Sequence, residues 1–240
     1  AAEYGTMTLD QLMEVFADRT HVISMSAALD ETFEEALERI QTEAIDAVIT
    51  HAQCLILDDQ EVLEGNRLWI DPLLVTSAVD KALRMADFEP NLRRRTGIVV
   101  RSGALRDLHD MALCVSLGAN ALVPYALFAV ALGVAPKGRS ADLESETVIT
   151  TTRNTVKAIK VGIEKITSTI GCHELRGYGH SFSSIGLSKG IASIFGTPNY
   201  FGSDGRGLTW GALRDDAEER AAEMRGETRA RMVNPDRIFP

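Results

Sequence analysis

Hydrophobic positions along this chain form two patterns, short continuous apolar runs and longer stretches with a period of three to four residues. Continuous runs are typical of strands buried in a parallel sheet, whereas the longer period is typical of helices with one buried face. Strands are predicted at residues 22–25, 47–50, 97–100 and 121–123, and residues 54–57 are a strand or part of a long loop. The two patterns alternate, which predicts repeated strand–helix units.

Helix starts are marked by residues that satisfy free backbone N–H groups. Thr32 and Glu35 have the spacing of a capping box, so a helix is predicted to begin there, with Asp30 as the alternative cap. Pro72 in a first helical turn costs no hydrogen bond and predicts a helix over residues 72–85. Further helices are predicted at about 105–117, from Pro124 onward and at about 210–224, the last with Ala217, Ala221 and Met224 on its inner face.

The longest periodic stretch predicts an amphipathic helix that begins at Arg153. The residues that share its apolar face are Val156, Ile159, Ile163, Ile166 and Ile170. Gly171 is predicted to end this helix, because glycine is common just after a helix end. A short strand-like segment, HELRG, follows and leads into a Gly-x-Gly turn.

Strand, turn and helix succeed one another about four or five times, and such units make right-handed crossovers around a parallel sheet. The predicted fold is therefore α/β, a parallel sheet of repeated βα units that resembles an incomplete (β/α) barrel. We expect residues 1–240 to form a single domain, with residues 191–240 as a C-terminal extension or linker. Because the chain does not open with methionine, we also expect it to be a segment of a larger protein.

Composition and charge exclude several classes of function. The 240 residues carry a formal net charge of −9, and their densest basic cluster is Arg93–Arg95. We interpret that cluster as a solvated turn, which argues against nucleic acid as a partner. The longest apolar run, residues 119–134, is too short and too interrupted to cross a bilayer, so no membrane partner is expected. The three cysteines are far apart, which argues against a zinc site or disulfide scaffold and favours a cytoplasmic location.

Ligands of parallel α/β folds bind at the carboxyl ends of the strands. Arg101, Arg106 and His109 follow the predicted strand at residues 97–100, so we expect them to gather near that rim. No serine or cysteine nucleophile with an evident partner accompanies them. The alternative interpretation is the ordinary polarity of a helix surface.

A glycine turn supplies a second candidate site, because Gly177, Gly179, His180 and Ser181 offer N–H and side-chain donors that could cradle a phosphate. A dinucleotide fingerprint would need a third glycine where Phe182 stands. A tight turn between a strand and a helix explains both glycines without a ligand. We favour this structural interpretation.

Three other polar positions are candidates for binding. Arg153 and Asn154, at the predicted head of the long helix, could bind an anion or a neighbouring domain, or form a solvated first turn. Arg176 stands beside the glycine turn and would contribute to a phosphate site there. Cys172 and His173 are adjacent residues that would point to opposite faces of a strand, so no catalytic residue and no metal ligand is predicted.

Three blocks of sequence, in this order, resemble the central domain of the large subunit of glutamate synthase. They are DPLLVTSAVDKALR (71–84), TGIVVRSGALRDLHDMALCVSLGANALVPYALF (96–128) and RNTVKAIKVGIEKITSTIGCHELRGYGHSFSSIGL (153–187). The resemblance covers residues 70–190 well and residues 20–50 loosely. Thr152 stands where the family commonly has tyrosine, and the segment after the long helix departs from the family pattern, so the chain resembles a divergent branch.

The resemblance implies a place in glutamate biosynthesis and ammonia assimilation. An enzyme of this family is an oxidoreductase that releases ammonia from glutamine in an amidotransferase domain. The ammonia then passes internally to a domain with FMN and an iron–sulfur cluster, where 2-oxoglutarate becomes glutamate. The resemblance implies that this chain is the non-catalytic central domain between those two partners, with no cofactor of its own.

Two alternatives stay open. The first is a small stand-alone α/β enzyme that binds a flavin or a phosphate ligand through the glycine turn, with Arg106, His109 and Arg176 at the strand ends. The second is a free-standing interaction module that retains the domain without its catalytic neighbours.

Overall fold

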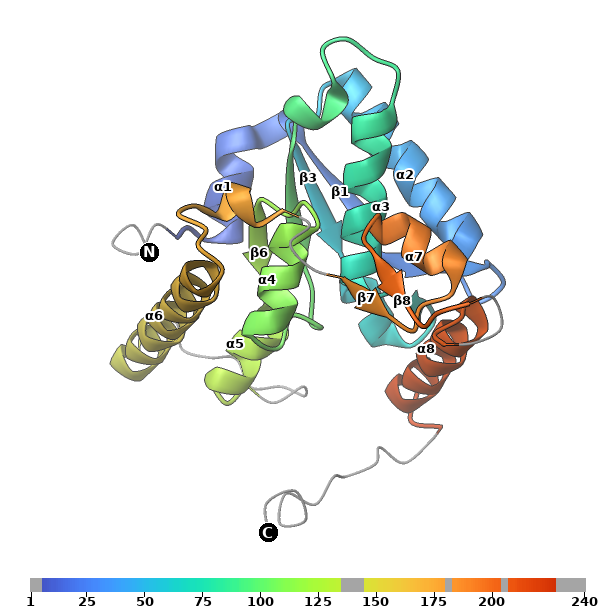
Figure 1. Ribbon diagram of the computed structural model, residues 1–240. Coiled ribbons are helices and arrows are strands. Elements are labelled where there is room, and N and C mark those ends of the chain that lie inside the picture. The colour runs from blue at the N-terminus through green and yellow to red at the C-terminus, as the bar shows by residue number, and fades with distance from the viewer. Residues whose placement is uncertain (1–5, 135–144, 180–182, 204–206, 228–240) are drawn as a thin grey trace.

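The computed structural model describes residues 6–134, 145–179, 183–203 and 207–227. Its centre is a four-stranded parallel sheet in the order β1-β3-β5-β6 (Figure 1). The strands are β1 (Thr20–Ser24), β3 (Cys54–Asp58), β5 (Gly97–Arg101) and β6 (Ala121–Val123). The helices that connect them in turn are α2 (Phe33–Thr50), α3 (Pro72–Met85) and α4 (Leu108–Ser116). The predicted α/β fold with repeated βα units is confirmed.

Strands that are neighbours in the sheet are also consecutive along the chain, so every crossover steps in the same direction. In the parallel register Thr20 pairs with Cys54, and Cys54 pairs with Gly97. This is the strand order of a (β/α) barrel. Within the described ranges, however, the sheet has free edges at β1 and β6. The arrangement is consistent with the predicted incomplete barrel.

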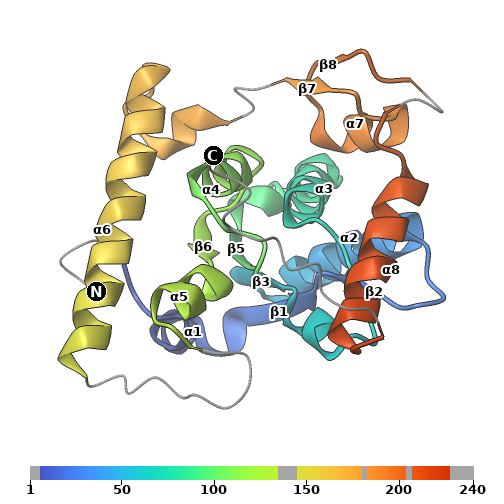
Figure 2. The same cartoon turned by 90° about the horizontal axis from the view of Figure 1, so that it is seen from below.

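Smaller elements surround the sheet (Figure 2). The short strands β2 (Ser26–Ala27) and β4 (Leu68–Trp69) pair in antiparallel fashion, whereas β7 (Ser184–Ile185) and β8 (Asn199–Tyr200) pair in parallel. The other helices are α1 (Leu9–Phe16), α5 (Tyr125–Ala131), α6 (Glu146–Thr169), α7 (Lys189–Phe195) and α8 (Trp210–Met224). The short 3-10 turns are η2 (Ala17–Arg19), η3 (Gln60–Glu64), η4 (Leu92–Arg94) and η5 (Leu175–Tyr178). No helix among the described residues is long and apolar enough to cross a membrane.

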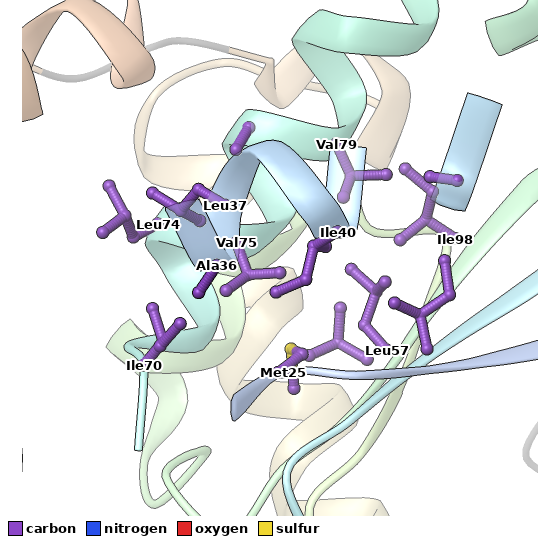
Figure 3. Packing of buried hydrophobic residues seen from close by; sticks show 14 of the residues in the cluster. Met25, Ala36, Leu37, Ile40, Leu57, Ile70, Leu74, Val75, Val79 and Ile98 are labelled. Atoms are coloured by element: carbon purple, nitrogen blue, oxygen red, sulfur yellow. The ribbon is translucent and has the colours of Figure 1, made fainter. Parts of the chain in front are cut away.

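The main hydrophobic core lies between one face of the sheet and the helices α2 and α3. Ile40 of α2, Leu57 of β3 and Val75 of α3 meet there and are fully buried (Figure 3). Side chains alternate along a strand, so the residues next to Leu57 in β3 point to the other face of the sheet. That second face carries a smaller cluster made of Cys54, Ile56 and Val99, against which α1 packs Leu9, Leu12 and Phe16. The two faces of the sheet are therefore covered unequally.

One predicted strand is wrong, because residues 47–50 are the last turn of α2. The capping box of Thr32 and Glu35 starts this helix as predicted. Ala44 and Val48 are buried four residues apart, which continues the inward face of the helix toward its end. An apolar run of four residues does not by itself separate a strand from a buried helical segment. The ambiguous segment at residues 54–57 is the strand in this region, β3.

The long helix α6 also differs from its prediction, since it begins at Glu146 rather than Arg153. It packs against α4 and α5, and of its residues only Thr167 is buried. Ile170 is 49% exposed, so the predicted apolar face is only partly covered. Gly171 ends the helix as predicted, with φ +76°. The strand-like prediction for the segment HELRG is wrong: its last three residues belong to the 3-10 turn η5, and no strand of the described residues pairs with it.

Helix α8 packs its small residues inward. Ala217 is fully buried and Ala221 is 4% exposed, as predicted, but Met224 is 53% exposed and does not belong to the inner face. Two arginines fasten the ends of the helix to backbone carbonyls. Arg214 donates to Leu29 O at 2.6 Å and to Glu31 O at 2.9 Å, whereas Arg225 donates to Gly65 O at 2.6 Å.

The cluster Arg93–Arg95 is not a uniformly solvated turn. Arg93 points inward and bonds the carboxylate of Asp80, a residue that is 2% exposed. The exposed Arg94 fits the solvated interpretation, whereas Arg95 stacks over the ring of Phe88 at 5.5 Å. A buried carboxylate needs a cationic partner, and this need accounts for the inward position of Arg93.

Candidate functional site

The carboxyl ends of β3, β5 and β6 border a cleft of about 340 Å³. The loops after β3 and β5 supply Asp59 and Gly103 to one wall, the first residue of α5 supplies Tyr125, and α8 supplies the facing wall. This is the edge at which parallel α/β folds bind ligands, because loops from several strands converge there. The charged residues that line the cleft are Asp59, Arg67, Asp71, Arg106, Asp110, Arg220 and Glu223.

Asp59 is the most buried charged residue of this wall, with 1% of its surface exposed. Its carboxylate accepts hydrogen bonds from Ser102 Oγ at 2.5 Å, Tyr125 Oη at 2.9 Å and the Gly103 N–H at 3.2 Å. Burial raises the pKa of the Asp59 carboxyl, and the three donors oppose that rise. The carboxylate therefore ties together the segments that follow β3, β5 and β6.

The geometry around Asp59 favours a positioning role over acid–base chemistry. A general base must come within hydrogen-bond reach of the proton that it abstracts. Both oxygens of Asp59 already accept hydrogen bonds from the chain, and the carboxylate has almost no exposed surface. Gly103 leaves just enough room for this arrangement, since a Cβ at that position would lie 2.9 Å from Tyr125 Oη.

The raised pKa of Asp59 predicts a pH dependence of stability. Its folded-state pKa lies above the unfolded value, so the ionised carboxylate destabilises the folded chain at neutral pH. As the pH falls from 7 through the folded pKa toward an unfolded value of about 3.9, protonation removes that cost. We therefore expect the free energy of unfolding of the wild-type chain, minus that of the Asp59→Asn variant, to increase as the pH is lowered over this range.

Urea denaturation at several pH values measures this difference. The exposed Asp30→Asn variant serves as the control, and its difference from the wild-type chain should not follow the same course. A difference for Asp59→Asn that stays constant or falls as the pH is lowered would contradict the assigned environment of Asp59.

Arg101 lies at the rim, as its position after the strand predicts, and it is engaged within the chain. Its Nη1 donates to Asp58 Oδ2 and to Gln60 Oε1, both at 2.7 Å. The guanidinium also stacks over the Tyr125 ring at 5.6 Å. Arg101 therefore braces the ends of β3 and β5 and supports the ring that bonds Asp59.

Arg106 lines the cleft, whereas His109 lies in the first turn of α4 with its side chain 87% exposed. Arg106 is 75% exposed and lies 3.6 Å from Asp110, a loose surface ion pair. His109 is not among the residues that line the cleft. The structure thus places Arg101 and Arg106 at one rim but does not bring His109 into the same cleft.

The other candidates lie away from this rim. Arg153 and Asn154 are exposed residues within α6, two turns after its start rather than at its head. Arg176 and Gly177 belong to η5, and Gly179 follows with φ −58°, a value open to any residue. His180 and Ser181 lie outside the described residues.

The glycine turn and the rim lie at opposite ends of α4. Gly162 of α6 packs on Leu108, the first residue of α4, and both helices then advance about 10–12 Å in the same direction to their ends. The turn η5 follows α6 and contacts α4, and it lies near the end of α4 in Figure 1. Arg106 and His109 lie at the beginning of that helix.

Sequence reasoning missed Asp58, Asp59, Ser102 and Tyr125 as parts of this edge. The available signal was the pair Asp58-Asp59 directly after the apolar run 54–57, which places carboxylates at a strand end only if that run is a strand. In the described part of the chain, no group of three or more His, Cys, Asp and Glu side chains could hold a metal ion.

Comparison with known proteins gives one consistent result. A sequence model of the glutamate synthase central domain matches residues 5–188. The NADPH glutamate synthase large chain of Bacillus subtilis (strain 168) is 28% identical over 223 residues, 89% of this chain and 14% of that protein. The large chain of Azospirillum brasilense is 30% identical over 191 residues, 75% of this chain and 12% of that protein. The chloroplastic ferredoxin-dependent glutamate synthase of Spinacia oleracea is 28% identical over 193 residues, 77% of this chain and 11% of that protein.

This chain therefore spans 14% or less of the length of those three relatives. The matched region ends at residue 188, just before α7. Helix α8, which forms one wall of the cleft, thus lies beyond the part of the chain that matches the family's sequence model.

Proposed function

Because the chain belongs to the glutamate synthase central domain family, we propose that it is the central, non-catalytic domain of a glutamate-synthase-type enzyme. In that enzyme, an amidotransferase domain releases ammonia from glutamine, and a domain with FMN and an iron–sulfur cluster uses the ammonia to make glutamate from 2-oxoglutarate. This chain holds the two domains at a fixed separation, so that ammonia does not escape to solvent. The proposal includes a cytoplasmic location and no cofactor bound to this segment.

The observation that carries the proposal is the open edge of the sheet at β6. Parallel sheets are normally covered on both faces, because their strands are apolar on both sides. Ala121, Leu122 and Val123 of β6 are only partly buried by the described residues. The helix that follows, α5, has the apolar sequence YALFAVA and no buried residue, and Val130 is 79% exposed. Such a surface favours burial against a neighbouring domain.

The carboxyl edge of the sheet supports the non-catalytic part of the proposal. In a catalytic α/β domain, the residues at this edge present reactive groups to a ligand. Here the Asp59 carboxylate accepts hydrogen bonds from Ser102 and Tyr125. Arg101 donates to Asp58 and Gln60. The contacts hold the loops together, as a rigid spacer requires.

Absorbance and coupling measurements test the proposal together. We expect the purified chain to carry no flavin absorbance. Co-expressed with the amidotransferase and FMN segments of the same source, it should co-purify with both and couple glutamine hydrolysis to glutamate formation. Val130→Asp should weaken this association about tenfold, because burial of a charge at an interface costs more than a kcal/mol.

Met85→Asp is the matched control, since Met85 is 76% exposed at the end of α3, far along the chain from α5. It should leave co-purification and coupling unchanged. A stoichiometric flavin spectrum from the chain alone would overturn the non-catalytic assignment. Equal retention of the neighbours by Val130→Asp and the wild-type chain would overturn the role of α5.

A further inference from the structure

A long groove lies on the opposite side of the sheet from β6, where the free edge of β1 meets α2. Its volume is about 740 Å³, about twice that of the cleft at the carboxyl ends of the strands. Thr20 and His21 of β1 line one side. Side chains of α2 from Glu35 to Thr50 line the other, a distance of about 22 Å at the rise of an α-helix.

The lining of this groove is strongly acidic. Five carboxylates face it, from Asp18, Glu35, Glu38, Glu43 and Asp46. His21 lies 2.9 Å from Glu43. Within the described ranges, no basic side chain lies within ion-pair distance of Asp18, Glu38 or Asp46.

The one arginine that lines the groove makes its hydrogen bonds to Glu31 and Ser26 rather than to a groove carboxylate. Arg39 Nε donates to Glu31 Oε1 at 2.8 Å, and its Nη2 donates to Ser26 O at 2.7 Å. The Arg39 guanidinium is therefore engaged by Glu31, which is not a lining residue. A negative potential extends along the groove as a result.

The strand beside the groove has unused backbone groups. One side of β1 pairs with β3, and no strand of the described residues pairs with its other side. A free strand edge is a template for an added strand.

We propose that this groove docks an extended, lysine- or arginine-bearing segment of a neighbouring polypeptide, which adds as a strand to β1. The groove length of about 22 Å matches a strand of six to seven residues, at about 3.3 Å per residue. Main-chain hydrogen bonds to β1 hold the segment, and its basic side chains on one face reach the carboxylates of α2. The proposal rests on the proposed function only in that a neighbouring domain would supply the segment.

A labelled peptide of seven alternating lysine and valine residues tests both components. We expect saturable binding by fluorescence anisotropy that weakens with added salt, and no binding of the matched glutamate–valine peptide. A version with N-methyl groups on alternate backbone nitrogens keeps the charge but cannot pair as a strand. It should bind at least about tenfold more weakly, because several backbone hydrogen bonds are lost.

Variants of the chain locate the site. The triple variant Glu38→Gln, Glu43→Gln and Asp46→Asn should weaken binding about tenfold, since it removes charge on the groove and leaves the capping residue Glu35 intact. The triple variant Glu146→Gln, Glu164→Gln and Asp215→Asn makes the same charge change on exposed positions elsewhere and should bind as the wild-type chain does.

Several outcomes overturn the proposal. Equal binding of the N-methylated peptide would show a charged surface without strand addition. Equal weakening by both triple variants would show a response to net charge alone. Self-association of the chain in sedimentation experiments, lost in the groove variant, would show a second copy as the occupant. None of these outcomes alters the flavin and coupling tests, so the two proposals fail separately.

Discussion

Replacing Arg93 with methionine should lower the free energy of unfolding by about 3–5 kcal/mol. Arg93 Nε lies 2.6 Å from Asp80 Oδ1, and this carboxylate is 4% exposed. The same guanidinium donates to Thr96 O at 2.8 Å, Gly118 O at 2.7 Å and Asn120 Oδ1 at 2.9 Å. Methionine fills similar space but leaves one buried charge poorly compensated and three acceptors without this donor.

The network is costly to break because it joins several parts of the fold. Asp80 lies on α3, Arg93 in η4, and Gly118 and Asn120 in the connection to β6. Gly118 has φ +123°, and a Cβ there would overlap the Asp80 side chain. Arg84 also bonds Asp80, but it is 58% exposed and its contribution is screened by solvent.

Chemical denaturation of Arg93→Met and Arg94→Met measures the effect. Arg94 lies next to Arg93 in η4 but is exposed, so its replacement should change stability by no more than about 0.5 kcal/mol. Similar losses of unfolding free energy in the two variants would mean that the buried contacts of Arg93 do not stabilise the fold as assigned. Circular dichroism at low denaturant confirms that both variants start from the same fold.

The sequence predicts most of this fold because local signals and burial agree in most elements. Pro72 and Thr32 mark helix starts, Gly171 marks a helix end, and the apolar run at residues 97–100 is strand β5. The prediction of secondary structure fails where tertiary contacts, rather than local sequence, decide between helix and strand. Residues 47–50 have strand-like composition but extend α2, because α2 keeps one buried face to its end.

The candidate site is harder to predict, because its residues are brought together by the register of strands that are far apart in the sequence. Asp59, Ser102 and Tyr125 are far apart in sequence and meet only because β3, β5 and β6 are parallel neighbours that end at the same edge. The strand-end argument therefore finds Arg101 and Arg106 but not the carboxylates that engage them. Pairing between distant strands leaves no local signal in the sequence.

The acidic groove is hidden from sequence analysis for a related reason. Glu35, Glu38 and Asp46 are ordinary exposed residues of an amphipathic helix when α2 is considered alone. They become a groove only because β1 is an edge strand and packs beside that helix. The arrangement of strands in the sheet thus decides which polar faces are surfaces for a partner.

Replacing Leu57 with alanine should cost about 2–5 kcal/mol of stability, the usual range for a buried leucine. Leu57 lies in the interior strand β3, is fully buried and packs between α2 and α3 (Figure 3). Val22 of the edge strand β1 pairs with Ile56, which points to the other face, and Val22 is 48% exposed. Val22→Ala should therefore cost less than about 1 kcal/mol.

Urea denaturation of the two variants compares the two faces of the sheet directly. A large loss for Leu57→Ala and a small one for Val22→Ala would show that the α2 and α3 side carries the stability of the isolated chain. Equal losses would contradict the assignment of the main core to the side of the sheet that α2 and α3 cover.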